Sequence, residues 1–110
     1  MRMEKDLILD VLDAIEAIER YASRGKESFE SDELVQVWIL YHLQIIGEAS
    51  RAMSKEVHDA DPTIPWKGII GMRNILVHQY SSVEPSLIWE MVVTDIPVLK
   101  EKLSRLLDLF

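Results

Sequence analysis

Cysteine is absent from this 110-residue chain, so disulfide bonds and thiolate metal sites are excluded. That absence is typical of a cytosolic protein. The first ten residues carry scattered charges and no long apolar core, so we expect no secretory signal. The most apolar run, residues 37–47, is interrupted by His42 and Gln44 and is too short to cross a bilayer. We therefore expect a soluble, cytoplasmic protein that makes no membrane contact.

Basic residues are scarce as well, because 12 Lys and Arg stand against 19 Asp and Glu, a net charge of −7. Non-specific RNA binding is driven by basic surface, so this balance argues against a broad nucleic-acid platform. The deficit lies in residues 1–60, which hold 7 basic and 13 acidic residues, whereas residues 61–110 hold 5 and 6. The second half could still house a small site for a single-stranded RNA loop, and the acidic half could face a basic partner protein.

Strand patterns, repeats and low-complexity segments are also missing, and helical periodicity dominates. A first amphipathic helix of about 20 residues has apolar side chains at three- and four-residue steps, namely Leu7, Ile8, Val11, Leu12, Ile15, Ile18 and Ala22. Its acidic residues fall on the outer face. Residues 23–31, which include an Arg-Gly-Lys sequence, are predicted to form a loop.

A second helix is predicted from Ser31, as its N-cap, to about Val57, with acidic residues in the first turn where they suit the helix dipole. Its middle, residues 37–46, is apolar nearly all round. That pattern indicates burial on more than one side, either at the centre of a bundle or at a subunit interface. Gly47 and Ala49 would let another helix approach closely there.

Prolines set the remaining boundaries. Residues 61–65 break the chain with two prolines, and Pro65 suits the first turn of a third helix over 66 to about 78. Pro85 is predicted to start a final helix after a turn, and Pro97 is predicted to kink or break that helix. The whole chain is thus predicted to be one all-α domain, an antiparallel up-and-down bundle of four or five helices.

Residues 71–80, reading GMRNILVHQY, place Arg73, Asn74, His78 and Tyr80 on an otherwise apolar stretch. The planar fork of arginine suits a phosphate, and histidine can take and give a proton near neutral pH. RNA cleavage needs one group to take the 2′-hydroxyl proton and another to stabilise charge on the phosphorane oxygens. His78 could do the first and Arg73 the second, while Asn74 could orient the phosphate or the imidazole. No metal is required, and no H-E-x-x-H pattern occurs.

Helix geometry limits how these side chains can meet. Asn74 and His78 are four residues apart and share a helix face, but Arg73 and His78 lie about 140° apart around an ideal helix. They could converge if the helix ends or tightens near His78, or if two copies of the chain meet across a two-fold axis. The very apolar second helix favours two copies, because it needs more cover than one bundle provides. Tyr80 would lie just past the helix end, partly exposed.

A structural role is the alternative for each of these residues, since an arginine and a histidine five positions apart occur by chance in many proteins. Arg73 could form a surface ion pair, and His78 could interact with the helix dipole. Structural roles are also expected for the histidines and tryptophans outside the motif. We expect His42 to be a hydrogen-bonded core residue and His58 to be a surface residue at a helix end. Core or interface anchors are expected at Trp38, Trp66 and Trp89.

The wider pattern resembles the HepT-like branch of the HEPN superfamily, the toxin partners of MNT-type nucleotidyltransferase antitoxins. Matching segments occur in order along essentially the whole chain: Ile46-Gly47-Glu48-Ala49, Ile64-Pro65-Trp66, Gly71-Met72-Arg73-Asn74, His78, Tyr80, Trp89 and Ile96-Pro97. The resemblance implies a metal-independent endoribonuclease toxin of a type VII system, which needs no cofactor and cleaves RNA such as tRNA or mRNA. It also implies a composite active site at a homodimer interface, with Arg73 and His78 as catalytic residues.

The resemblance gives three further residues a role. It implies that the cognate nucleotidyltransferase attaches AMP to Tyr80, which would place a repelling phosphate near the RNA site. Glu48 matches the family's Gly-Glu-Ala stretch and could reach the motif from the second helix, where we expect a structural role. Gln79 departs from the family's usual aspartate, which could alter the orientation of His78 or only the recognition of the antitoxin. This departure and the acidic charge support a second hypothesis, a non-catalytic helical module that pairs with a nucleotidyltransferase.

Overall fold

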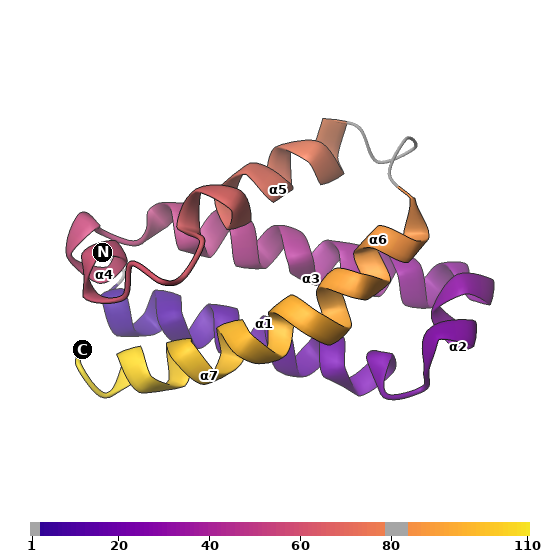
Figure 1. The fold of residues 1–110 in the computed structure, drawn as a ribbon, viewed down its shortest axis with the longest axis horizontal. Coiled ribbons are helices and arrows are strands. Elements are labelled where there is room, and N and C mark those ends of the chain that lie inside the picture. Colours follow the sequence, from indigo (N-terminus) through magenta and orange to yellow (C-terminus); the bar gives the residue numbers. More distant parts are fainter. Residues whose placement is uncertain (1–2, 79–83) are drawn as a thin grey trace.

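Four long helical segments run up and down along the molecule, with short helices at its two ends (Figure 1). The computed structural model describes residues 3–78 and 84–110. Over these residues the elements are α1 (Glu4–Ala22), α2 (Lys26–Ser31), α3 (Glu33–Ala52), α4 (Lys55–Ala60), α5 (Trp66–His78), α6 (Pro85–Glu90), the π-helical η2 (Met91–Asp95) and α7 (Ile96–Leu107). The predicted all-α up-and-down bundle is confirmed. None of the described helices is long and apolar enough to span a membrane.

The core forms where α1 packs against α3 and α7, and α5 packs along the other side of α3. Its fully buried aliphatic side chains include Ile8, Val11, Ile15 and Ile18 of α1, Ile39, Leu43 and Ile46 of α3, and Leu103 of α7. Burying one such side chain contributes about 1.5–3 kcal/mol to folding. The central position of α3 therefore explains much of the apolar circumference seen in its sequence.

The chain between α1 and α3 differs from the prediction. Part of the predicted loop over residues 23–31 is helical, because α2 begins after Gly25, whose φ of 97° lies in the left-handed region that glycine tolerates. The N-cap of α3 is Asp32 rather than Ser31. The Asp32 carboxylate accepts a hydrogen bond from the Leu34 amide at 2.9 Å, and this bond fixes the start of the helix at the aspartate.

The predicted end of the second helix near Val57 is also wrong. α3 ends at Ala52, where Met53 turns to an extended conformation. Ser54 then caps the separate helix α4, and its hydroxyl accepts a hydrogen bond from the Val57 amide at 3.3 Å. A serine can satisfy a free amide at a new helix start, and here that local capping overrides the continuing apolar periodicity.

The predicted interruption at Pro97 takes the form of a π-helical turn rather than a break. Pro97 lies in the first turn of α7, immediately after η2. The Ile96 amide donates to the carbonyl of Met91, five residues back, which is the wide hydrogen-bonding pattern of a π-helix. Widening the helix before a proline lets the helical backbone continue into α7 without a break.

Candidate active site between α3 and α5

Arg73 lies on α5 where Gly47 of α3 allows a close approach of the two helices. A Cβ atom added to Gly47 would lie 2.9 Å from the Cβ of Arg73 and 3.2 Å from the carbonyl oxygen of Ile69. Both distances are shorter than ordinary contacts between carbon and carbon or carbon and oxygen. The predicted close approach at Gly47 is therefore confirmed, and it occurs at the arginine of the motif.

Glu48, the next residue on α3, forms an ion pair with Arg73. The Nε–H of Arg73 donates to Oε1 of Glu48 at 3.1 Å, and the two side chains are 33% and 57% exposed. No described residue accepts a hydrogen bond from either Nη atom of Arg73. The guanidinium is thus held through one of its five N–H groups. The other four are on the two Nη atoms, which can donate to a phosphate.

The other motif residues follow along α5 and beyond it. Asn74 is exposed on α5. His78 is the last residue of this helix, as predicted, but its side chain is outside what the structure describes. Gln79 and Tyr80 lie outside the described residues altogether. The structure therefore brings Arg73 and Glu48 together.

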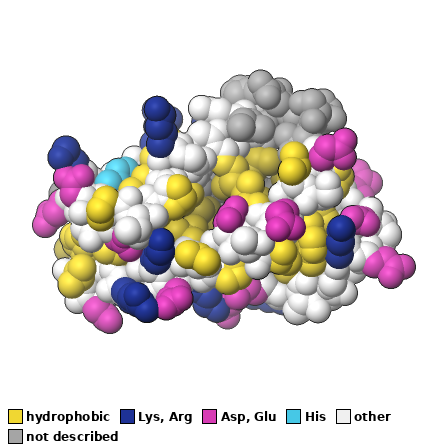
Figure 2. Space-filling view, in the orientation of Figure 1, with side chains coloured by type: hydrophobic (Ala, Val, Ile, Leu, Met, Phe, Trp, Pro, Cys, Tyr) yellow, Lys and Arg dark blue, Asp and Glu magenta, His cyan; other side chains and the backbone are white. Residues whose placement is uncertain are grey.

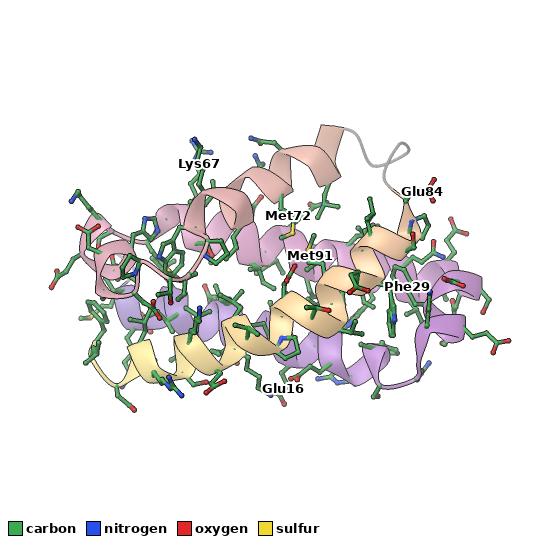
Figure 3. The ribbon with its side chains drawn as sticks, in the orientation of Figure 1. Glu16, Phe29, Lys67, Met72, Glu84 and Met91 are labelled. Atoms are coloured by element: carbon green, nitrogen blue, oxygen red, sulfur yellow. The ribbon has the colours of Figure 1, made fainter. Side chains whose placement is uncertain are left out.

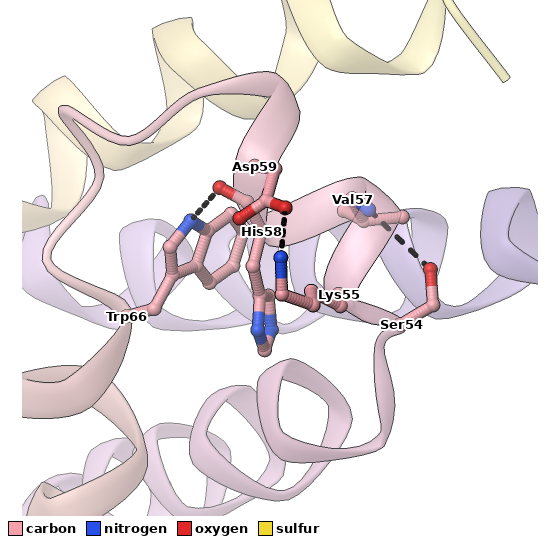
Figure 4. Close-up of polar contacts among 6 residues, drawn as sticks. All are labelled: Ser54, Lys55, Val57, His58, Asp59 and Trp66. Carbon is pink, nitrogen blue, oxygen red and sulfur yellow. Dashed lines mark hydrogen bonds and ion pairs between the residues drawn. The ribbon is translucent and has the colours of Figure 1, made fainter.

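The remaining histidines and tryptophans make structural contacts. His58 lies in the last turn of α4, near a helix end as predicted, but it is half-buried rather than on the surface because its ring packs against Trp66 at 4.6 Å between centroids (Figure 4). Its Nε2 is 2.8 Å from the Ser50 carbonyl, and the Trp66 indole donates to the His58 carbonyl at 3.1 Å. His42 likewise bonds to the Trp38 carbonyl, through Nδ1 at 2.7 Å. No cluster of three or more His, Asp or Glu suitable for a metal occurs in the described part of the chain.

One face of α3 stays uncovered in the single chain. Leu34, Val37 and Tyr41, which we call the α3 stripe, are 80%, 53% and 59% exposed. Spacings of three and four residues place them on one side of the helix, and continuing this spacing leads to Glu48. No Asp, Glu, Lys or Arg occurs from 34 to 47. An exposed apolar row without carboxylates or basic side chains is typical of an interaction surface.

A groove between α5 and η2, which the sequence did not predict, lies beside the site. Figure 2 shows hydrophobic side chains lining a hollow below α5, and in Figure 3 Met72 and Met91 face each other across it. Its volume is about 420 Å³, and Ile46 and Leu99 also line it, with Lys102 among its few polar residues. Arg73 is not one of the lining residues. No sequence pattern marks this groove, because it arises where α5 and α7 do not pack against each other.

Sequence comparison relates the chain to a group of known proteins. The profile of a family described as "Ribonuclease HepT-like" matches residues 11–106. A Thermococcus cleftensis protein named "Probable ribonuclease HepT" is 37% identical over 106 residues, 96% of both chains. A Methanocaldococcus jannaschii protein named "Putative RNase MJ1380" is 32% identical over 91% of this chain and 93% of its own length. No solved structure matches the chain significantly.

Proposed function

This chain belongs to the HepT-like ribonuclease family, and we propose that it is a metal-independent endoribonuclease, the toxin of a type VII HepT/MNT toxin–antitoxin pair. The observation that carries the proposal is the presentation of Arg73. Its Nε is held by Glu48 at the surface, and its Nη atoms have no partner among the described residues. A guanidinium presented in this way can donate two parallel hydrogen bonds to a phosphate of RNA.

The proposed reaction is an internal displacement at phosphorus. His78 takes the proton of a ribose 2′-hydroxyl, and the 2′-oxygen forms a bond to the adjacent phosphorus. The bond from phosphorus to the 5′-oxygen breaks, and the imidazolium can return a proton to that oxygen. The products are a 2′,3′-cyclic phosphate and a 5′-hydroxyl. Arg73 stabilises the negative charge of the phosphorane, and Asn74 orients the phosphate, so side chains supply every step.

A homodimer would complete this site. Although the chain carries a net charge of −7, the α3 stripe is free of charge, so a second copy can cover it without bringing like charges together. Around a two-fold axis the same stripe would be buried on both copies. Because the stripe leads to Glu48, that contact would also carry Arg73 of one copy toward the motif of the other.

Regulation is proposed to occur at Tyr80, two residues after His78 in the sequence. A cognate nucleotidyltransferase would transfer AMP from ATP to the tyrosine oxygen and release pyrophosphate. The added phosphate would repel the RNA phosphate, and the nucleotide would occupy the space that RNA needs. Incubation with the transferase and ATP should add AMP mass to the wild type and not to Tyr80→Phe. Equal labelling of both proteins would move the modification elsewhere.

The catalytic proposal is tested with purified protein and a single-stranded RNA in EDTA. Wild-type protein should cleave the RNA, whereas folded Arg73→Ala and His78→Ala should not. In cells, induction of the wild type should arrest growth and neither variant should. If His78→Ala remained equally toxic, or the folded wild type left all RNA intact in EDTA, the catalytic role would have to be abandoned.

The second candidate, a non-catalytic module that pairs with a nucleotidyltransferase, is favoured by the acidic charge and by Gln79. Gln79→Asp separates the two candidates because it introduces the aspartate that is usual at this position in the HepT-like family. An RNase whose His78 needs that carboxylate should gain activity in the variant. A binding module should show no cleavage with either residue and should still bind the transferase.

A further inference from the structure

We infer that Glu48 is a positioning residue for Arg73, and that Gly47 sets the distance between α3 and α5 that makes this positioning possible. The inference rests on the proposed RNase function and extends it. Glu48 would not touch the RNA. It would act through the guanidinium, by fixing the direction in which the phosphate-binding fork points.

The atoms used in the ion pair support this role. Glu48 accepts from Nε, 3.1 Å away, so the described contact leaves both Nη atoms of the guanidinium free to face a ligand. A bidentate carboxylate would instead occupy part of the fork. An unpaired arginine samples many rotamers and must be ordered when it binds phosphate. Glu48 removes part of that ordering cost before RNA arrives.

The close helix approach supports the same conclusion independently. Because Gly47 has no side chain, the backbone of α5 at Arg73 can lie close to α3. A Cβ atom added to Gly47 would lie only 2.9 Å from the Arg73 Cβ. Glu48 follows directly on α3, so the spacing that Gly47 permits also decides whether the carboxylate reaches Nε. Gly47 thus lets the two helices approach closely, and Glu48 holds the guanidinium of Arg73.

A role in stability alone explains the pair less well. Other ion pairs of described residues, such as Lys55–Asp59 and Arg105–Glu101, join neighbouring turns of one helix. Exposed pairs of this kind contribute little to folding.

The Glu19–Lys100 pair resembles the Glu48–Arg73 pair in joining two helices. Its charged atoms are 2.8 Å apart, and its side chains are 43% and 48% exposed. Since it lies on α1 and α7, it provides a matched control for an inter-helix ion pair away from the site.

Positioning predicts opposite effects of the glutamine variant on substrate binding and on turnover. Glu48 places a negative charge near the phosphate site, so Glu48→Gln should bind RNA more tightly and lower KM, an effect that added salt should weaken. The glutamine oxygen can still accept from Nε, so kcat should fall only a few-fold. Glu48→Ala loses the acceptor as well, and misdirecting the fork should lower kcat on the order of tenfold to a hundredfold.

The experiment measures cleavage of a fluorescent single-stranded RNA in EDTA over a range of substrate concentrations and two salt concentrations. It compares wild type, Glu48→Gln, Glu48→Ala, Arg73→Ala and the control Glu19→Gln, with thermal unfolding and oligomeric state recorded for each. We expect kcat to fall in the order wild type, Glu48→Gln, Glu48→Ala, a lower KM for Glu48→Gln, and unchanged constants for Glu19→Gln.

The outcomes separate this inference from the function on which it rests. If Arg73→Ala abolishes cleavage but both Glu48 variants keep wild-type kcat and KM, the positioning role is wrong and the RNase function stands. The positioning role is equally wrong if Glu19→Gln changes the constants as much as Glu48→Gln. If Arg73→Ala cleaves like the wild type, or the wild type does not cleave RNA at all, the proposed function and this inference both fail.

Discussion

Replacing Gly47 by alanine tests whether the close approach of α3 and α5 is a real constraint. In a helix interior this change normally stabilises a protein by about 0.5–1 kcal/mol, because alanine restricts the unfolded chain. At Gly47, however, the new methyl group would meet the Arg73 Cβ at 2.9 Å and the Ile69 carbonyl at 3.2 Å. Neither obstacle is the end of a flexible side chain, so the helices must move apart.

The magnitude follows from these opposing terms. Overpacking a buried contact costs about 1–3 kcal/mol, so after the gain in helix propensity we expect Gly47→Ala to lose about 1–2 kcal/mol. For a chain of this size each kcal/mol lost corresponds to a fall in Tm of about 4–8 °C. Gly71 on α5 is the matched control, since a Cβ added there would have nothing within 4 Å. Gly71→Ala should therefore gain about 0.5–1 kcal/mol.

Urea and thermal unfolding at one fixed protein concentration would measure both variants, because self-association would otherwise shift the apparent stability. The two alanine substitutions should move Tm in opposite directions. Separating the helices should also weaken the reach of Glu48 to Arg73, so Gly47→Ala should lose RNase kcat while Gly71→Ala should not lose it by this route. If Gly47→Ala were as stable as Gly71→Ala, the described spacing between α3 and α5 would be wrong.

Three further predictions concern other parts of the chain. If the proposed dimer forms through the α3 stripe, Val37→Asp and Tyr41→Asp should lower the solution mass from dimer to monomer and reduce RNase activity per chain, as light scattering and cleavage assays can check. A dimer that the substitutions leave unchanged would exclude the α3 stripe as the interface. The hydrogen bond from the Thr63 hydroxyl lowers the pKa of Asp61 below its usual 3.8. This hydrogen bond therefore stabilises the fold above pH 3.8, and its contribution is lost as the pH falls through the folded-state pKa. Thr63→Val should raise the Asp61 pKa measured by NMR and weaken the pH dependence of stability, while the Thr63 amide still donates to the carboxylate. Ser50 is fully buried and its hydroxyl has no hydrogen-bond partner among the described residues, so Ser50→Ala should be neutral or stabilising by up to about 1 kcal/mol, and clear destabilisation in urea would reveal a missed partner.

Local signals made much of the fold predictable. The apolar period of α1 and the prolines at 65 and 85 correctly gave the first helix and the starts of α5 and α6. The failures occurred where two local signals competed. Ser54 sits inside an unbroken apolar pattern, and only the folded chain shows that its capping bond wins over continuation of the helix. Likewise, Asp32 and Ser31 are both acceptable caps by residue type.

The candidate site was predictable only as far as its residues are close in sequence. The motif itself was read from residues 71–80, but the Arg73–Glu48 pair joins residues 25 positions apart. The family resemblance singled out Glu48, which could reach the motif from the second helix, but it could not give the spacing between α3 and α5 on which the contact depends. The groove lined by Met72 and Met91 was missed for a related reason, because it reflects where helices fail to pack.

The acidity of the chain becomes consistent with RNA cleavage once binding and orientation are separated. Binding substrate and transition state equally well does not accelerate chemistry, so a strongly basic surface would mainly hold RNA and its products. In the proposed site, a carboxylate beside the phosphate-binding arginine would weaken that general attraction and at the same time fix the direction of the fork. Glu48 next to Arg73 would weaken the attraction for RNA at the site itself, and the net charge of −7 would weaken it over the whole surface. Selectivity for the transition state would then come from the orientation of the Arg73 guanidinium. Little attraction would remain to hold an RNA phosphate that the guanidinium does not bind.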